Sequence, residues 1–280
     1  MNLIIENIKK AYLNKLPFVA YNKPNEDSVY GVFQNDDALE AVSTNFKNKG
    51  FIFAPFDNSK QTVFFSLEKS RFIEDTLKIE GEMMFRSEKY FNNTSKKGHE
   101  QIVEKAIEEI DKGLFKKVVI SRREMIAIEV FEIETVFKKL LQAYPNAFVY
   151  VWYHPKVGLW FGATPETLLK VENAQFRTMS LAGTQVYKEG SEPNWSPKEV
   201  EEQQLVTDYI VNKLSDFSVN LELSSTETVK AGALQHLKTD IRGELDIEKE
   251  DSLFSLIDVL HPTPAVCGLP KDTAKQFILE

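Results

Sequence analysis

Residues 148–166 constrain the fold of this chain more than any other stretch. A run of aromatic and branched residues, Phe148–Tyr153, is followed by a turn at Gly158 and by a second apolar run that reaches Ala163. Two such runs on either side of a glycine turn predict buried strands. A glycine and a proline then place the carboxyl group of Glu166 at the end of this buried structure. A desolvated carboxyl group can act as a general acid near neutral pH. A glutamate after Thr-Pro is also typical of the first turn of a helix.

Hydrophobic periodicity along the rest of the chain predicts an α+β protein. Short apolar runs predict strands, and apolar residues at helical spacing predict helices between them. The expected strands cover residues 51–54, 62–67, 117–121, 174–180, 226–230 and 235–245, and the expected helices cover residues 99–112, 136–143, 197–214 and 273–280. The polar stretch Asn92–Gly98 is the best candidate for a linker. We therefore expect an N-terminal α+β subregion over residues 1–95 and a second region over residues 96–280.

Composition excludes several classes of protein. The 280 residues carry a formal net charge of −8, which disfavours nucleic-acid partners because these favour basic surfaces. The one cysteine, Cys267, cannot form a disulfide within the chain, which is typical of a reducing compartment. Residues 1–10 lack the pattern of a signal peptide, and no apolar run approaches a membrane span. We expect a cytoplasmic protein without a membrane partner, in which any anionic ligand needs local cations and backbone donors.

A second candidate for chemistry is a lysine at the start of an apolar strand, in the segment Lys117–Arg122. A lysine acts as a base near neutral pH only where burial or a nearby cation disfavours its charge. The pattern is also compatible with an exposed lysine that flanks the strand, and the adjacent Lys116 competes for the role. The strand pattern alone therefore does not choose between the two lysines.

Two further segments carry groups that suit an anionic ligand and a metal ion. Ser180–Thr184 combines hydroxyl groups with a glycine, which lets the main chain approach a ligand closely. Ser196, Pro197 and Glu199 together predict a helix start with a capping box. Glu199 and Glu202 lie three residues apart, so they share a helix face, and two carboxylates there suit Mg²⁺. An ordinary strand end and an ordinary helix start remain the alternatives.

Taken in order, these segments resemble the chorismate-utilising enzymes, and most closely the isochorismate synthases. The resemblance rests on residues 117–122, 161–166, 180–184 and 198–202 and extends over residues 99–280. It implies the chorismate-binding-enzyme fold, with large, mostly antiparallel sheets and helices packed outside them. It makes residues 96–280 a chorismate-binding catalytic region that is truncated at its C-terminus, because further strands and a final helix follow in the family. A chain truncated in this way is expected to bind Mg²⁺ and chorismate poorly.

The resemblance also implies roles for individual residues. Lys117 would deprotonate the attacking water, and Glu166 would protonate the departing hydroxyl. Glu202 would be the nearer ligand of Mg²⁺, with Glu199 as the second, directly or through water.

Four further residues are implied in substrate binding. Gly183 and Thr184 would contact a substrate carboxylate, although Gln185 stands where the family often has Arg. His236 matches a family histidine near the substrate, and Ala265 lies in a Pro-rich loop beside the ring pocket. A single strand histidine is also typical of a core group, and a buried thiol such as Cys267 is typical of packing.

The implied reaction is the Mg²⁺-dependent isomerisation of chorismate to isochorismate, by addition of water at C2 and loss of the C4 hydroxyl. The runner-up is a salicylate synthase, in which a Thr tends to replace Ala265, or another chorismate-utilising enzyme. A truncated remnant without activity is the alternative from a different class. The product would feed menaquinone or siderophore biosynthesis, and Glu201, where siderophore relatives often carry His, leans towards menaquinone. The family contains many monomers, so we expect a monomer.

Overall fold

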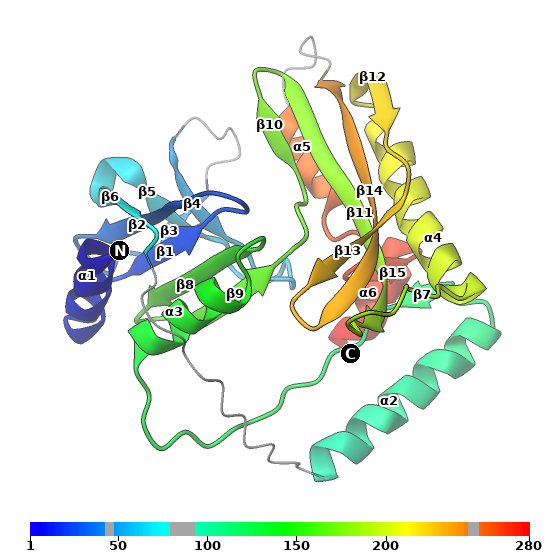
Figure 1. Ribbon diagram of the computed structural model, residues 1–280, viewed down its shortest axis with the longest axis horizontal. Coiled ribbons are helices and arrows are strands. Elements are labelled where there is room, and N and C mark those ends of the chain that lie inside the picture. The colour runs from blue at the N-terminus through cyan, green and yellow to red at the C-terminus, as the bar shows by residue number, and fades with distance from the viewer. Residues whose placement is uncertain (43–47, 79–92, 246–251) are drawn as a thin grey trace. The chain divides into compact units, whose positions relative to one another are not determined.

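The computed structural model describes residues 1–42, 48–78, 93–245 and 252–280 (Figure 1). The chain divides into two compact units, each of them discontinuous in sequence. The first unit comprises Met1–Phe85 and Val130–Glu166, and the second comprises Arg86–Glu129 and Thr167–Glu280. The predicted division into regions 1–95 and 96–280 stays a prediction.

The helices and strands are as follows. The described helices are α1 (Asn2–Leu13), η1 (Leu67–Lys69), α2 (Asn93–Asp111), α3 (Ile133–Ala143), α4 (Pro197–Leu214), α5 (Ser252–Leu260) and α6 (Lys271–Leu279). The described strands are β1 (Phe18–Asn22), β2 (Ser28–Gln34), β3 (Glu40–Ala41), β4 (Gly50–Phe53), β5 (Val63–Ser66), β6 (Ser70–Thr76), β7 (Lys117–Val118), β8 (Phe148–His154), β9 (Gly158–Thr164), β10 (Lys170–Glu172), β11 (Gln175–Val186), β12 (Ser218–Leu223), β13 (Glu227–Ala231), β14 (Leu234–Leu245) and β15 (Gly268–Leu269).

The first unit is built on a five-stranded sheet with the strand order β6-β2-β1-β8-β9, in which every neighbouring pair is antiparallel. A smaller sheet has the order β3-β5-β4. Apolar residues of α1 and α3, among them Ile8 and Phe137, share a core cluster with Phe18 of β1. A second cluster contains Trp152 and Phe65, whose rings stack with centroids 5.4 Å apart. Burial of these side chains is the main stabilising term for this unit.

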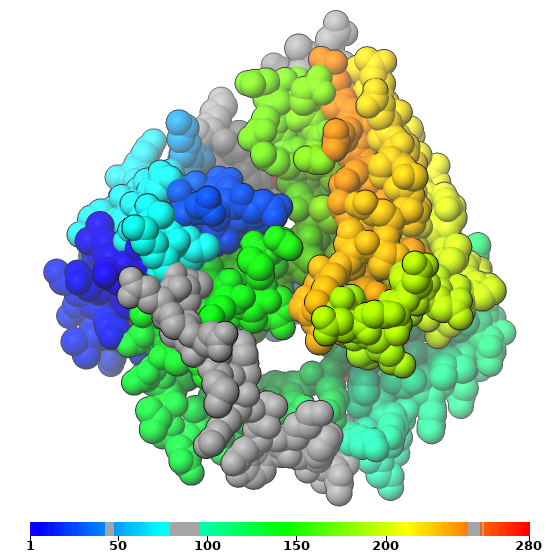
Figure 2. Space-filling view, viewed as in Figure 1, coloured from blue at the N-terminus to red at the C-terminus, as the bar shows by residue number. Residues whose placement is uncertain are grey.

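The second unit is built on the antiparallel path β10-β11-β14-β12, with β13 also paired to β14. The helix α4, yellow in Figure 1, runs along this sheet. Its buried residues Val206, Ile210 and Leu214 share a core cluster with Ile241 of β14. Figure 2 shows β12 and β14 side by side on one face of the unit, as their pairing requires. The short strands β7 and β15 form a separate two-stranded sheet.

The predicted α+β class with mostly antiparallel sheets is confirmed, and so are the bounds predicted for α4. Several other boundaries were wrong, among them the end of the strand predicted over residues 174–180, which reaches Val186, and the start of the helix predicted over residues 136–143, which lies at Ile133. Residues 93–98 of the predicted linker are helical, and residue 92 lies outside the described residues. The strand predicted over residues 117–121 ends at Val118, because its partner β15 offers two residues for pairing.

Two described helices, α1 and α5, were missing from the predicted elements. Both lie in segments where apolar residues are frequent, so their helical spacing was not recognised. Within the part of the chain that the structure describes, no helix combines the length and the apolar character needed to cross a membrane.

Candidate active site

The position of Lys117 is fixed by the short sheet of β7 and β15. Lys117 pairs with Leu269, and its side chain is only 11% exposed. Its Nζ lies 3.1 Å from Glu202 Oε1 and donates a hydrogen bond of 2.7 Å to the backbone oxygen of Pro264. The competing Lys116 is exposed. Of the two lysines, Lys117 is therefore the one that combines burial with contact to a carboxylate.

The first two turns of α4 present two carboxylates with different partners. The backbone N–H of Ser196 donates to Glu199 Oε2 at 2.7 Å, and the Ser196 hydroxyl donates to the same oxygen. These hydrogen bonds from Ser196 lower the pKa of the Glu199 carboxyl group. One turn later, Glu202 faces Lys117. Glu199 therefore serves the helix start, as its capping-box pattern predicts, while Glu202 joins the candidate base.

Gly183 forms a β-bulge in β11. The register with β14 shifts between Ala182 and Thr184, so that one extra residue is accommodated at 183. Its φ of +71° lies in the left-handed region, which glycine adopts without a steric penalty. A Cβ atom at this position would lie 3.2 Å from the backbone oxygen of Glu199. The glycine therefore lets β11 come close to the start of α4, and its predicted contact with a substrate carboxylate stays a prediction.

Thr184 and His236 face each other across β11 and β14. His236 Nδ1 lies 3.1 Å from Thr184 Oγ1 and 3.2 Å from the backbone oxygen of Gly183. A carbonyl only accepts, so this geometry favours a proton on Nδ1 and leaves Nε2 as an acceptor. The alternating burial of β14 places His236 on the face of the sheet opposite α4. The structure thus joins Thr184 to His236 through this contact.

Glu166 follows the hairpin of β8 and β9, whose antiparallel pairing confirms the two strands predicted around Gly158. The half-buried Glu166 donates its backbone N–H to Thr164 Oγ1 at 3.3 Å. It ends the first unit, whereas Lys117 belongs to the second. The predicted pairing of the two residues across one pocket therefore stays a prediction.

The Pro-rich loop after α5 is tied directly to the candidate base, because the acceptor of Lys117 is the backbone oxygen of Pro264. The next residue, Ala265, donates its N–H to Thr263 Oγ1 at 3.3 Å and packs partly buried against the core of the second unit. Cys267 is fully buried, and this burial raises the pKa of its thiol. A thiol that resists ionisation is a poor nucleophile, which agrees with the packing role expected for it.

The donor set at the start of α4 suits Mg²⁺, although no group of three or more His, Cys, Asp or Glu side chains capable of holding a metal is found among the described residues. Glu199 and Glu202 supply hard oxygen ligands one turn apart. The Glu202 side chain is 34% exposed, so water can complete a coordination shell. Mg²⁺ is commonly held by one or two carboxylates and several waters. The residues therefore fit the ion, and its binding stays a prediction.

Two groups beside this site were not anticipated from the sequence. One is the Pro264 carbonyl, and a backbone oxygen leaves no signal in a sequence. The other is Gln203, which is 3% exposed and donates to Thr239 Oγ1 and Ser180 Oγ at 2.8 and 3.0 Å. Gln203 and Thr207 are polar residues within the buried stripe of α4, and this stripe is recognised only in the structure.

Comparison with known proteins identifies the family of this chain. Residues 56–280 match the family described as chorismate binding enzyme. The salicylate biosynthesis isochorismate synthase of Pseudomonas aeruginosa is 30% identical over 185 residues, which cover 63% of this chain and 38% of that protein. Isochorismate synthase DhbC of Bacillus subtilis is 28% identical over 194 residues, which cover 63% of this chain and 48% of that protein. The chain therefore spans about half, or less, of the length of these curated relatives.

Solved structures share the fold. A crystal structure of DhbC from Bacillus anthracis superposes with a TM-score of 0.73 at 20% identity and covers 98% of this chain and 80% of that one. MenF, the menaquinone-specific isochorismate synthase of Escherichia coli, superposes with a TM-score of 0.61 at 18% identity and covers 94% of this chain and 72% of that one. At these identities the similarity shows a common architecture.

Proposed function

Because this chain belongs to the chorismate-binding enzyme family, we propose that it isomerises chorismate to isochorismate. The observation that carries the proposal is the burial of Lys117, whose side chain is 11% exposed, within the residues that match the family. Curated relatives from Pseudomonas, Bacillus and Haemophilus that carry the name isochorismate synthase support the choice of reaction.

The reaction is a balanced exchange of hydroxyl groups. Water adds at C2, the ring double bonds shift, and the C4 hydroxyl leaves as water, so the composition is unchanged and no redox cofactor is required. Lys117 takes a proton from the attacking water, and Glu166 gives a proton to the departing hydroxyl. The Nζ atom of a neutral lysine can make three hydrogen bonds. Among the described residues, Glu202 and the backbone oxygen of Pro264 take two of these positions. We assign the third position to the attacking water.

The carboxylates of the substrate need local partners, because the chain carries a net charge of −8. Glu202 would bind Mg²⁺, with Glu199 as a second ligand, directly or through water. When bound, the ion neutralises a substrate carboxylate and orients the ring. Gly183 and Thr184 would contact a substrate carboxylate, and His236 would lie near the substrate.

A product assay tests the proposal. The purified protein is incubated with chorismate and Mg²⁺, and isochorismate, salicylate and pyruvate are separated and quantified. We expect isochorismate to form in proportion to the chorismate lost, to stop on addition of EDTA and to resume when Mg²⁺ is restored. Release of pyruvate with salicylate would replace the proposal with a salicylate synthase. Conversion no faster than that of a Lys117→Met variant would overturn it.

A further inference from the structure

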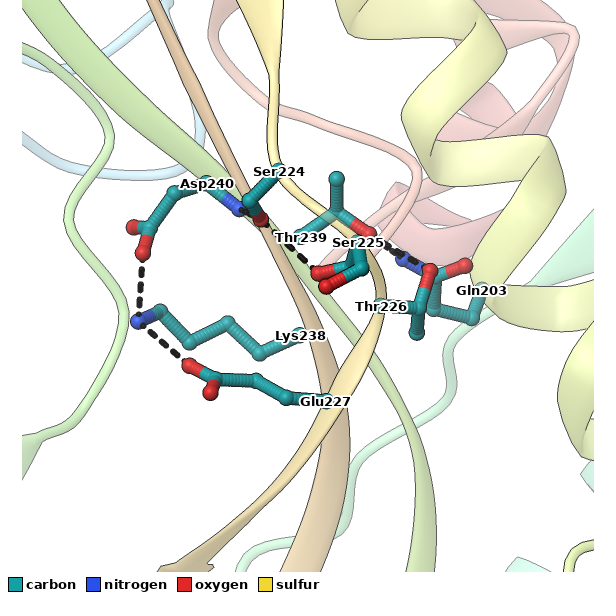
Figure 3. A network of polar contacts seen from close by, with 8 residues as sticks. All are labelled: Gln203, Ser224, Ser225, Thr226, Glu227, Lys238, Thr239 and Asp240. Carbon is teal, nitrogen blue, oxygen red and sulfur yellow. Dashed lines mark hydrogen bonds and ion pairs between the residues drawn. The ribbon is translucent and has the colours of Figure 1, made fainter.

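A buried polar network joins α4 to the sheet beside the candidate site. Gln203 follows Glu202 in the chain and is 3% exposed. Its Nε2 lies 2.8 Å from Thr239 Oγ1 on β14, 3.0 Å from Ser180 Oγ on β11 and 3.0 Å from Thr207 Oγ1 on α4. Figure 3 shows the side chain reaching from the helix to Thr239. An amide nitrogen carries two hydrogens, so the three oxygens share two donors.

The hydroxyl groups of this network also contact one another. Ser180 Oγ and Thr207 Oγ1 lie 2.6 Å apart, and Thr207 Oγ1 donates to the backbone oxygen of Gln203 at 3.1 Å. Thr239 Oγ1 lies 2.9 Å from Thr226 Oγ1, which precedes β13 (Figure 3). Ser180 and Thr239 are direct partners in the pairing of β11 with β14. The sheet therefore holds two of the oxygens at fixed positions, and Gln203 has to meet both of them.

This network specifies one placement of the helix. Apolar contacts survive small rotations, whereas hydrogen bonds are directional, and a buried hydroxyl left without a partner is costly. Successive residues of a helix are rotated by about 100°, so a turn of α4 that breaks the contacts of Gln203 also moves Glu202. Glu199 adds a second constraint, because its backbone oxygen lies 3.2 Å from where a Cβ atom of Gly183 would be.

We propose that Gln203 is a positioning residue of the candidate active site. Its hydrogen bonds set the rotation and height of α4 on the sheet, so that Glu202 Oε1 lies against Lys117 Nζ. The effect on turnover rests on the proposed function, whereas the effect on geometry does not. A buried polar residue that fixes the register of a helix is a well-attested role for such groups.

The geometric test measures the coupling between Lys117 and Glu202. Lys117→Met, Glu202→Gln and the double variant are compared by urea denaturation in the original chain and again with Gln203→Leu. We expect the two substitutions to be non-additive in the original chain and additive in the Gln203→Leu background. Coupling of the same size in both backgrounds would overturn the proposal.

Two matched variants separate positioning from general destabilisation. Leu214→Ala removes a fully buried residue at the far end of α4, outside the network, and should lower stability while the coupling remains. Gln203→Asn keeps the amide on a shorter side chain and should restore part of the coupling. If Gln203→Leu does not fold, Thr239→Val removes one acceptor of the same amide and takes its place, with the same expected loss.

The kinetic test separates this proposal from the proposed function. Gln203→Leu should lower kcat about 10- to 100-fold, because small misplacements of reacting groups have effects of this size. The Mg²⁺ concentration for half-maximal rate should rise, and KM for chorismate should change less. If Gln203→Leu abolished the coupling between Lys117 and Glu202 but left turnover unchanged, Gln203 would be a positioning residue and Glu202 would have no role in the reaction. If the coupling between Lys117 and Glu202 were retained in Gln203→Leu, the positioning role would be overturned, whatever the rate of turnover. If the original chain showed no turnover, the proposed function would be contradicted, and the coupling measurement would still decide the positioning role.

Discussion

Each of the two units packs helices on an antiparallel sheet, but the two interfaces are filled differently. In the first unit, α1 and α3 meet the sheet mainly through apolar side chains, as Phe137 and Phe18 illustrate, and the polar contact of the Met1 ammonium group with Asp75 of β6 lies at the start of α1. In the second unit, α4 combines apolar residues with a buried amide, Gln203, which is surrounded by hydroxyl groups of the sheet and the helix. The first interface has its polar contacts at the end of a helix, whereas the second has buried hydrogen bonds within the helix.

The difference follows from what each kind of contact tolerates. Apolar cores accept volume-conserving substitutions with small losses, because dispersion and hydrophobic burial are not directional. A buried polar network in which every group has a partner is directional and tolerates few substitutions, because each buried group that loses its partner lowers stability. It is the unit with the polar interface that also holds Lys117 and Glu202 in contact.

The largest expected effect separates chemistry from packing in the second unit. Lys117→Met should lower isochorismate formation by about 10²- to 10⁴-fold, the usual contribution of a general base, with an unchanged circular dichroism spectrum. Lys117→Arg is the control that keeps the positive charge, and it should not restore the rate, because a guanidinium group stays protonated. Product quantification by chromatography checks both variants. An unchanged rate in Lys117→Met would contradict the assignment.

Removing volume from the first unit should affect stability most. Phe137 is fully buried, so Phe137→Ala should lower the free energy of unfolding by about 3–5 kcal/mol. Urea denaturation followed by tryptophan fluorescence reports on this unit through Trp152 and Trp160. Phe72 is 46% exposed, so the matched variant Phe72→Ala should cost below about 1 kcal/mol. Equal losses in the two variants would show that the apolar core is not the stabilising feature of this unit.

Converting the polar interface to an apolar one tests the comparison itself. Gln203→Leu leaves hydroxyl groups without a donor and should cost about 1–3 kcal/mol. Adding Ser180→Ala, Thr207→Val and Thr239→Val removes these partners and should recover part of the loss, because removal of both members of a buried pair is nearly neutral. Thermal unfolding by calorimetry measures both proteins. If the fourfold variant were no more stable than the single one, unpaired hydroxyls would not be the cause.

A smaller effect is expected where β11 meets the start of α4. Gly183→Ala should destabilise by about 1–2 kcal/mol, because a left-handed backbone disfavours a side chain and the new Cβ atom would crowd Glu199. Gly190 is a matched control, with a φ of +73° and no atom within 4 Å of an added Cβ. Chemical denaturation of both variants separates the backbone term from the contact. Equal losses would mean that the approach of Glu199 adds nothing.

The smallest effect concerns pH and compares the buried His154 of the first unit with the half-buried His261 of the second. Burial lowers the pKa of His154 in the first unit and of His261 in the second. In the unfolded chain, these histidines bind protons below their ordinary pKa of about 6.5. In the native chain, the rings stay neutral to lower pH. The contribution of the neutral rings to the free energy of unfolding is therefore fully present above about pH 6.5, and it is lost as the pH falls through the native pKa values.

His154→Phe tests this dependence on pH. The backbone N–H of Lys156 loses its acceptor on His154 Nδ1, so stability at neutral pH should fall slightly. The decline in Tm between about pH 7 and pH 5 should nevertheless be shallower than in the original chain, because one proton-binding group of the unfolded state is gone. An unchanged slope would assign the decline to other groups.

The sequence predicted well those helices and strands whose formation depends on residues close together in the chain. The start of α4 follows from Ser196, Pro197 and Glu199, and the hairpin of β8 and β9 follows from two apolar runs around Gly158. Elements that depend on a distant partner were predicted less well. The branched residues after Lys117 favour a longer strand than the two-residue partner β15 can pair.

The residues of the candidate site also fall into those that could be predicted from the sequence and those that could not. The family resemblance selected Lys117 and Glu202, and the structure places the two residues in contact. It did not indicate Gln203, because glutamine is usually exposed and the buried stripe of α4 is recognised only once the helix lies on its sheet. The bulge at Gly183 depends on pairing with β14, a strand that begins far along the chain, so no local pattern reveals it.

That bulge makes one position in β11 unusually tolerant of a change in length. The extra residue at 183 already interrupts the alternation of the strand, so its deletion would leave Thr184 opposite His236 and simply straighten the backbone. Deleting a neighbour such as Leu181 would instead invert the facing of every residue on one side of the gap. Natural insertions and deletions within this strand should therefore accumulate at 183, where the rest of the strand can keep its orientation.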